Sequence, residues 1–385
     1  MKSHPWITFR LNLNQASHRF WLLLGEAQSK CEHIAGVPLR PAVSKELHQV
    51  FLAKGILATT AIEGNTLNEQ QVRDRIEGKL QLPPSQEYLG QEIDNILDAC
   101  NLIVKRLVHD EISDIVFPET ILEYNQITLK NLPRDAEVIP GAIRTHEVGV
   151  GRYKAPPAQH CAQLLEHLCR FLNEDFNALE IGSIARGILK ATLAHLYLAW
   201  IHPFGDGNGR TARLVEFQML AAHGVPTPAA HLLSNHYNIT RAEYYRQQDA
   251  ASRSGGNVFP FLEYALKGFV DGLKNQLEII RHQVWDIVWR TYIHEIFKDQ
   301  NRASVVRRRR LALDLSIRGE RVPLNQIRSI TPRIAEQYAK KSSLTISRDV
   351  NALIELGLID KNAEGVRAKR EIILSFLPVR RLRDQ

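Results

Sequence analysis

The segment that most constrains the fold of this chain is residues 202–213 (HPFGDGNGRTAR), which lie between two apolar stretches. The stretch from 181 to 200 has helical spacing, and Pro203 and the three glycines of the segment cannot continue a regular helix. Helical spacing returns at Arg210, with leucine and phenylalanine recurring on one face until Gly224. The sequence therefore predicts a glycine-rich loop between two helices.

The residue types in this loop suit a phosphate group. The backbone N–H groups of Gly207, Asn208 and Gly209 would lie at the positive end of the second helix, where glycine allows an anion to approach closely. Arg210 and Arg213 are three positions apart, so both can project from the first turn toward the same anion.

Two further side chains suggest what the anion is. Asp206 offers hard oxygen ligands beside the phosphate site, which suits Mg²⁺ bridging two phosphates. His202 is the only residue of the segment that titrates near neutral pH, so it is the candidate general base. These residues indicate a nucleotide polyphosphate with Mg²⁺. A glycine-rich turn with a capping aspartate and solvated arginines is the simpler alternative.

Residues 202–213 match the motif HxFx(D/E)GNGRxxR at each fixed position, so the chain resembles the Fic family. The resemblance implies an all-helical core that transfers a nucleotide monophosphate, usually AMP from ATP, to a protein hydroxyl. It implies that His202 deprotonates a Ser, Thr or Tyr of the target and that Phe204 points into the core. It also implies that Asp206 binds Mg²⁺, with ATP as the co-substrate.

The same resemblance assigns the remaining residues of the loop. Asn208 and the amides of Gly207 and Gly209 would hold the phosphates, while Arg210 and Arg213 would take the β- and γ-phosphates.

A second motif ends a helical stretch that starts near Ser44. Thr59 and Glu63 are four residues apart, so they share a helix face, and Gly64 is suited to end the helix. The pattern resembles the family's inhibitory motif (S/T)xxxE(G/N), in which the glutamate pairs with the last arginine of the nucleotide loop. Here that pair would be Glu63 with Arg213, and the carboxylate would compete with the phosphate. A helix end with a solvated glutamate is the alternative.

Residues 140–157 are the best hairpin candidate in the chain, because β-branched residues mix with glycine and two prolines close the run. The stretch lies where the Fic family carries its flap and is similar to it in pattern. The resemblance implies that Ile143, Val148 and Val150 lie on an edge that pairs with an extended segment of the target. A surface hairpin without a ligand is the alternative.

Two tyrosines follow the loop at a distance of about thirty residues, at Tyr244 and Tyr245. In the family a Tyr-Tyr pair at this place lines the adenine and ribose pocket, so the resemblance implies that both residues bind the nucleotide. Otherwise, paired tyrosines on a helix belong to the core and its rim. This chain has Ser252 where the family often has an asparagine that contacts the base.

The end of the chain has a different character. Residues 331–340 and 344–359 resemble the two helices of a winged helix-turn-helix, and residues 370–377 would form the returning strand. A scaffold that packs on the core or supports a dimer is the alternative. If the module binds DNA, the residues that would face the major groove or the phosphates are Ser343, Thr345, Ser347, Arg348 and Arg307–Arg310.

We therefore predict a mainly α protein with a Fic helical core, a β-hairpin flap, a helical N-terminal region and a C-terminal winged helix-turn-helix (α+β). The predicted domains are residues 1–110, with the inhibitory helix near 44–65, residues 111–285 and residues 300–385. A length of 385 residues and 44% hydrophobic content fit this number of domains. The net charge of +7 is compatible with an acidic partner or nucleic acid but requires neither.

The cysteines and the apolar stretches bear on the compartment. The four cysteines have no paired metal-site spacing, and no apolar stretch is long enough to span a bilayer. The first residues are not followed by the apolar core of a signal peptide. We therefore expect a cytoplasmic protein with no membrane partner.

The predicted function is that of a protein adenylyltransferase, which moves AMP from ATP·Mg to a Ser, Thr or Tyr hydroxyl of a target protein and is autoinhibited by Glu63. One alternative is the same scaffold transferring another nucleotide or a phosphoryl group, or removing AMP. Another is a DNA-binding regulator with a nucleotide-sensing Fic domain. ATP and a target protein are the expected partners, and a homodimer and DNA stay open.

Overall fold

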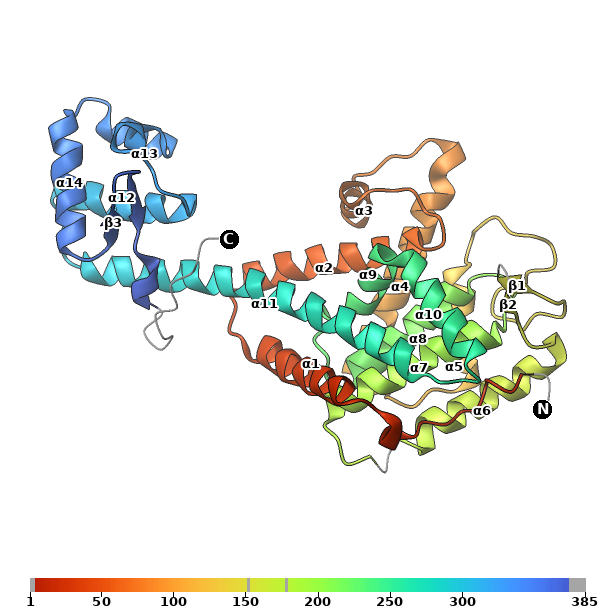
Figure 1. The fold of residues 1–385 in the computed structure, drawn as a ribbon. Coiled ribbons are helices and arrows are strands. Elements are labelled where there is room, and N and C mark those ends of the chain that lie inside the picture. The colour runs from red at the N-terminus through yellow and green to blue at the C-terminus, as the bar shows by residue number, and fades with distance from the viewer. Residues whose placement is uncertain (1–3, 151–152, 177–178, 374–385) are drawn as a thin grey trace. The chain divides into compact units, whose positions relative to one another are not determined.

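The computed structural model describes residues 4–150, 153–176 and 179–373. The chain divides into two compact units, Met1–Leu277 and Glu278–Gln385 (Figure 1). Each unit has its own hydrophobic core, and the chain is mainly helical, as predicted. No described helix has both the length and the apolarity needed to cross a bilayer.

Helices build nearly all of the first unit, and their starts follow local sequence signals. Ser17 caps α1 by accepting a hydrogen bond from the N–H of Phe20 at 3.1 Å. Asn68 and Gln71 form a reciprocal capping box at the start of α3. The helices are α1 (His18–Gly36), α2 (Pro41–Ala61), α3 (Glu69–Ile76), α4 (Glu87–Val108), α5 (Pro118–Thr128), α6 (Cys161–Glu174), α7 (Ser183–Ile201), α8 (Asn208–Ala222), α9 (Leu232–Ile239), α10 (Arg241–Arg253) and the first part of α11 (Phe259–Ile296), which continues past Leu277 into the second unit.

Helices α7 and α8 are buried along nearly their whole length and pack against each other. A helix that is buried on all sides belongs to the interior of a domain. The core around this pair contains residues from Phe20 in α1 to Leu273 in α11. Residues 1–110 and 111–277 thus contribute to one core, and the division into three domains stays a prediction.

A short hairpin lies within the segment predicted as the flap. Strands β1 (Gly149–Val150) and β2 (Tyr153–Lys154) pair antiparallel, with Gly149 opposite Lys154 and Val150 opposite Tyr153. The two residues between the strands are outside the described part of the chain. The hairpin is shorter than the one predicted over residues 140–157, since residues 141–148 form turns and irregular backbone.

The second unit has helices α12 (Ala303–Arg318), α13 (Pro332–Tyr338) and α14 (Ser343–Glu355), followed by strands β3 (Ile359–Lys361) and β4 (Val366–Ala368). The strands pair antiparallel, and Val322 adds a bridge to Val366. Two helices joined by a short turn and followed by a hairpin are the elements expected of a winged helix-turn-helix, and that assignment stays a prediction.

The strand predicted over residues 370–377 is wrong for the part that the structure describes. Arg370–Ile373 form a 3-10 turn, and residues 374–377 lie outside the described residues. The second strand of the hairpin comes earlier, because the backbone N–H and C=O of Val366 both bond to Val322, at 2.9 and 2.8 Å. Strand formation depends on such a partner more than on the β-propensity of a segment.

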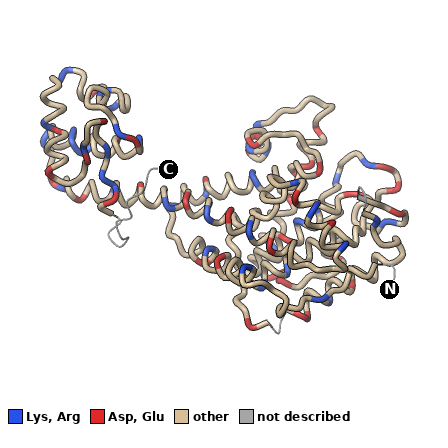
Figure 2. Tube along the Cα trace, in the orientation of Figure 1, with Lys and Arg blue, Asp and Glu red and all other residues tan. Residues whose placement is uncertain are grey.

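Two arginines of the run 307–310 have a partner within the second unit. The carboxylate of Asp349, 1% exposed, accepts hydrogen bonds from Nε of Arg307 at 2.6 Å and Nε of Arg308 at 2.9 Å. A buried carboxylate needs such partners, so the two arginine side chains stabilise the charge of Asp349 inside the unit. Figure 2 shows basic and acidic positions interspersed along both units.

Candidate functional site

The predicted loop joins the two most central helices of the first unit. α7 ends at Ile201, and the backbone of His202 is left-handed, with φ 49°. Gly207, with φ 75°, precedes α8 in a conformation that suits glycine. The side chain of Asn208 closes the loop, because it accepts from the N–H of Phe204 at 2.9 Å and donates to its carbonyl at 2.8 Å. Phe204 is buried in the core, as the resemblance implied.

The imidazole of His202 is held in a state that can accept a proton. Burial lowers its pKa below the ordinary value, and the Arg144 guanidinium lowers it further, although the carbonyl of Ala199, 3.4 Å from Nδ1, acts in the opposite direction. The imidazole is therefore neutral at pH 7, which is the form that a general base requires.

Arg144 connects the flap segment to the loop that carries His202, a role that was not predicted from its residue type or position. Its Nε donates to the carbonyl of His202 at 2.8 Å, Nη1 donates to that of His146 at 2.6 Å, and Nη2 donates to that of Pro156. Its backbone N–H donates to Pro203 at 2.9 Å. A single arginine ahead of the glycine-rich hairpin was the available signal.

Glu63 meets Arg213 at the end of α2. Nη2 of Arg213 donates to Oε1 of Glu63 at 2.6 Å, and Nε donates to Oγ1 of Thr59, also at 2.6 Å. The Arg213 side chain is 2% exposed and that of Glu63 is 30% exposed. A side chain at position 209 would collide with the Glu63 carboxylate, so the glycine permits this approach.

The pair is charged. Burial alone would raise the pKa of the Glu63 carboxyl, but the Arg213 guanidinium, together with Arg210 and His202, brings that pKa below its ordinary value. Likewise, burial opposes the charge of Arg213, and Glu63 raises the pKa of the guanidinium. Each partner thus stabilises the charge of the other in a poorly solvated place.

Arg210 does not share the partner of Arg213. Its Nη1 donates to Oε1 of Glu92, in α4, at 2.8 Å, and Nη2 lies 3.4 Å from both carboxylate oxygens of Asp206. The two arginines therefore have different carboxylate partners, and the sequence analysis did not identify Glu92. Only a long-range contact brings Glu92 here, across 118 positions of sequence.

A cavity of about 750 Å³ opens between this loop, the end of α2 and helix α10. Such a volume suits a small-molecule ligand. Among the predicted site residues of the loop, Asp206, Gly207 and Arg210 are not in the described lining of this cavity. The predicted site residues that line it are Glu63, His202, Asn208, Gly209, Arg213, Tyr244 and Tyr245.

The tyrosines form one wall of this cavity. Tyr244 is buried, and its hydroxyl lies 2.8 Å from Nε2 of the buried His195, whereas Tyr245 is 40% exposed. In the same helix, the hydroxyl of Ser252 donates to the carbonyl of Asp249 at 2.8 Å. Ser252 is not among the described lining residues of the cavity.

The flap residues lie outside the described lining of the cavity. Ile143 packs against the core, and Val148 is half-buried, with its carbonyl accepting from the N–H of Ala155 at 3.3 Å. The side chain of Val150 is outside the described part. Tyr153 of β2 does reach the cavity wall, and its hydroxyl donates to the carbonyl of Trp200 at 2.7 Å.

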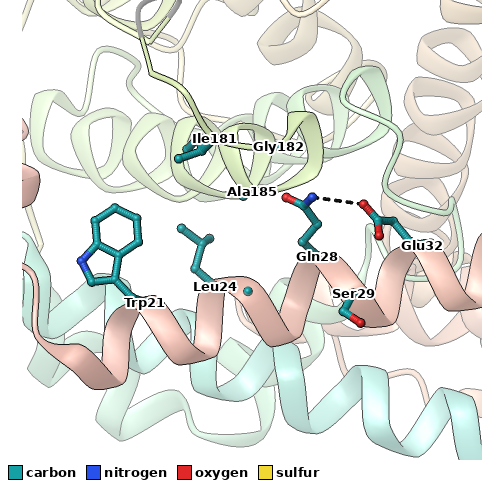
Figure 3. A pocket seen from close by; sticks show the side chains of 9 residues that line it. Trp21, Leu24, Gln28, Ser29, Glu32, Ile181, Gly182 and Ala185 are labelled. Atoms are coloured by element: carbon teal, nitrogen blue, oxygen red, sulfur yellow. Dashed lines mark hydrogen bonds between the residues drawn. The ribbon is translucent and has the colours of Figure 1, made fainter.

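A second cavity, of about 320 Å³, lies between α1 and the start of α7 (Figure 3). Trp21 and Leu24 form its apolar part, and Gln28 and Glu32 bond to each other at 3.1 Å. It has no histidine or arginine among its described lining residues, so it lacks the chemistry of the first cavity.

Asp206 is the residue to test as a metal ligand. Its side chain is 50% exposed, and Oδ1 accepts from the N–H of Gly207 at 2.5 Å. Within the described ranges, no group of three or more His, Cys, Asp or Glu could hold a metal ion. One carboxylate nevertheless fits Mg²⁺, which commonly takes one or two carboxylates and completes its shell with phosphates and water.

The chain is similar in sequence to known proteins. Residues 115–220 match the model of the Fic/DOC family. A Caenorhabditis elegans protein named protein adenylyltransferase fic-1 is 34% identical over 214 residues, which are 54% of this chain and 38% of that protein. A protein adenylyltransferase Fic of Nematostella vectensis is 24% identical over 250 residues, which are 64% and 53% of the two chains. The chain thus spans about half or less of the length of these relatives.

Solved structures share the fold. A Fic family protein from Desulfovibrio desulfuricans G20 superposes with a TM-score of 0.57 at 19% identity, over 94% of this chain and 98% of that one. A fragment of C. elegans Fic-1 superposes with a TM-score of 0.55 at 25% identity, over 68% and 73% of the two chains.

Proposed function

Since the chain contains a Fic domain, we propose that the protein is an adenylyltransferase that transfers AMP from ATP to a hydroxyl of a target protein, and that Glu63 keeps it inactive. One observation carries this proposal. A neutral, half-buried histidine and a buried arginine line the same cavity, and the Glu63 carboxylate lies 2.6 Å from Nη2 of that arginine. The relatives named adenylyltransferases support the same chemistry.

The first step belongs to His202. Its neutral imidazole accepts the proton of a Ser, Thr or Tyr hydroxyl while the hydroxyl oxygen attacks the α-phosphorus of ATP. A new oxygen–phosphorus bond forms, the bond from the α-phosphorus to the bridging oxygen breaks, and pyrophosphate leaves.

The charge on the phosphates is balanced by groups around the start of α8. The N–H groups of Gly207, Asn208 and Gly209 lie there, where the helix favours an anion. Nη1 of Arg213 is buried and has no hydrogen-bond partner among the described residues, so it retains a donor for phosphate. Arg210, which pairs with Glu92 and is not among the described lining residues, would contribute a second guanidinium. Fixed donors of this kind stabilise the transition state without reorganising.

Asp206 would hold Mg²⁺ by its half-exposed carboxylate, and the ion would neutralise phosphate charge. Tyr244 and Tyr245 would place the adenine and ribose against α10. The flap, with Ile143, Val148 and Val150, would align a target segment by backbone pairing.

Inhibition follows from the occupancy of Arg213. Thr59 accepts from its Nε at 2.6 Å, and Glu63 and the Thr59 carbonyl accept from Nη2 at 2.6 and 3.0 Å. A guanidinium held in this way does not orient a γ-phosphate. The Glu63 carboxylate also repels the phosphate, because both are negatively charged. The nucleotide must displace Glu63 before transfer is efficient.

The test is label transfer by three forms of the protein: wild type, Glu63→Gly and His202→Ala. Each receives Mg²⁺ and ATP labelled at the α- or the γ-phosphate, and label is counted on the protein itself and in a lysate. We expect only the α-label to transfer, more in Glu63→Gly than in wild type. His202→Ala should lower the rate by about 10²–10⁴-fold.

Other outcomes would select an alternative. Transfer of the γ-label would indicate phosphoryl transfer, and loss of label from a premodified protein would indicate AMP removal, with Glu63 aligning water. If Glu63→Gly transfers no label at all, AMP transfer is wrong for this chain.

The second unit supports a second candidate function, that of a DNA-binding regulator. Ser343 and Arg348 are exposed on α14, the second helix of the predicted helix-turn-helix. Salt-sensitive duplex binding that survives His202→Ala and is lost without residues 300–385 would support it. A homodimer and the cytoplasmic location stay predictions.

A further inference from the structure

We propose that Glu92 is the positioning residue of Arg210, and that Asn65 links the inhibitory turn to the same carboxylate. Loosening this link would weaken the hold of Glu63 on Arg213. The inference rests on the proposed function, because it describes how the inhibition of that site is maintained.

Glu92 holds Arg210 from α4. Its Oε1 accepts from Nη1 of Arg210 at 2.8 Å, and the two side chains are 15% and 5% exposed. A guanidinium that is so poorly solvated needs a carboxylate partner, and breaking the pair would leave a buried charge uncompensated. The second partner, Asp206, is farther away, at 3.4 Å, and half exposed.

Asn65 occupies the other oxygen of the same carboxylate. Its Nδ2 donates to Oε2 of Glu92 at 2.8 Å and to the carbonyl of Leu89 at 3.0 Å. Its Oδ1 accepts from the N–H of Leu67 at 3.0 Å. Asn65 is 7% exposed, so water does not replace these bonds easily.

The position of Asn65 in the chain makes this contact relevant to inhibition. It lies two residues after Glu63, and the N–H groups of both residues donate to the carbonyl of Thr60, at 3.0 and 3.1 Å. Between them, Gly64 has φ 105°, which makes the turn compact. Anchoring Asn65 on α4 therefore fixes where the end of α2 presents the Glu63 carboxylate.

Two carboxylates from two helices thus hold the two arginines of α8. Glu63 from α2 holds Arg213, and Glu92 from α4 holds Arg210. Asn65 connects the two pairs, since it follows Glu63 in sequence and bonds Glu92 in space. Through Asn65 and Glu92, the inhibitory turn is thereby connected to Arg210, whose contact with Glu92 does not depend on Glu63.

The first test measures binding of a non-hydrolysable ATP analogue with Mg²⁺ by calorimetry, using the full chain. Asn65→Ala should bind roughly tenfold more tightly than wild type, which corresponds to about 1.4 kcal/mol. In a Glu63→Gly chain, Asn65→Ala should change the affinity by less than about twofold, because the inhibitory carboxylate is already absent. Asn68→Ala is the matched control, since Asn68 caps α3 and should leave both affinities unchanged.

Equal tightening in both backgrounds, or in neither, would overturn the link. If Asn65→Ala does not fold, Asn65→Asp serves instead, because it keeps the acceptor for Leu67 and places a like charge against Glu92. This readout needs no AMP transfer. Failure of the adenylyltransferase proposal would show as Glu63→Gly transferring no label, whereas failure of the link shows only in the affinities.

The second test concerns the positioning of Arg210. In the Glu63→Gly chain, Glu92→Gln should raise the KM for ATP roughly tenfold, because the guanidinium loses its charged partner and its fixed direction. Glu92→Asp, which keeps the charge, should restore part of the loss. A purely structural role would lower kcat through the folded fraction and leave KM unchanged, and that result would overturn the assignment.

Discussion

Single residues decide the protonation state on which the chemistry depends. His202 is half-buried and close to the Arg144 guanidinium, and both the loss of solvation and the neighbouring positive charge disfavour its charged form. Glu63 and Asp206 act in the opposite direction but do not outweigh them. A base that is neutral at physiological pH needs no deprotonation before it acts.

We therefore predict the pH dependence of AMP transfer in Glu63→Gly. Because the active imidazole is neutral, kcat/KM should hold as pH falls to about 6.5, the ordinary pKa of histidine, and decline only below it. Removing Glu63, which raises the pKa of His202, should move the midpoint further down. Initial rates between pH 5 and 8 test this, with His202→Ala as the control that lacks the acid limb. A midpoint above 6.5 would contradict it.

At the scale of elements, the site depends on how the flap segment is fastened to the α7–α8 loop. The planar guanidinium of Arg144 donates hydrogen bonds to the carbonyls of His202, His146 and Pro156. Lysine carries a compact ammonium and cannot reproduce this fork. The proposed base and the flap segment proposed to align the target are thus held together by one side chain.

We expect Arg144→Lys in the Glu63→Gly chain to lower kcat by roughly 10- to 100-fold, since small displacements of a catalytic group are costly. The affinity for ATP should change little, because Arg144 is not among the described lining residues of the cavity. Label-transfer kinetics and calorimetry separate the two quantities. Arg134→Lys, at a position that donates to the nearby Leu132 carbonyl, is the matched control. Unaltered kcat in Arg144→Lys would remove the proposed role.

At the scale of the whole molecule, each of the two units has its own hydrophobic core, and α11 contributes residues to both. The core of the first unit runs from Phe20 to Leu273, and that of the second from Trp289 to Ala368. All the residues proposed for AMP transfer and its inhibition belong to the first unit, Met1–Leu277. Units with independent cores can fold alone.

A chain ending at residue 277 and carrying Glu63→Gly should therefore remain folded and keep α-label transfer within about threefold of the full-length variant, because both its core and its site are intact. Circular dichroism, thermal melting and label transfer check this. The same shortened chain with Glu63 intact is the control and should stay inhibited. Loss of activity in a folded fragment would show that the second unit takes part in the reaction.

Much of this protein could be predicted from local sequence. The loop 202–213 and its flanking helices follow from periodic apolar spacing broken by proline and glycine, and the resemblance to the Fic family is confirmed. The pairing of Glu63 with Arg213 was expected from a motif and is seen in the structure. Its inhibitory role stays a prediction.

Other features were decided only by the tertiary structure. Glu92 reaches Arg210 across 118 positions, and Arg144 reaches His202 across 58, and the local sequence names the partner in neither case. The second strand of the C-terminal hairpin is Val366–Ala368 because Val322 pairs there. Spacing along a helix or strand determines which residues share a face, but packing between distant segments decides which charge each of them meets.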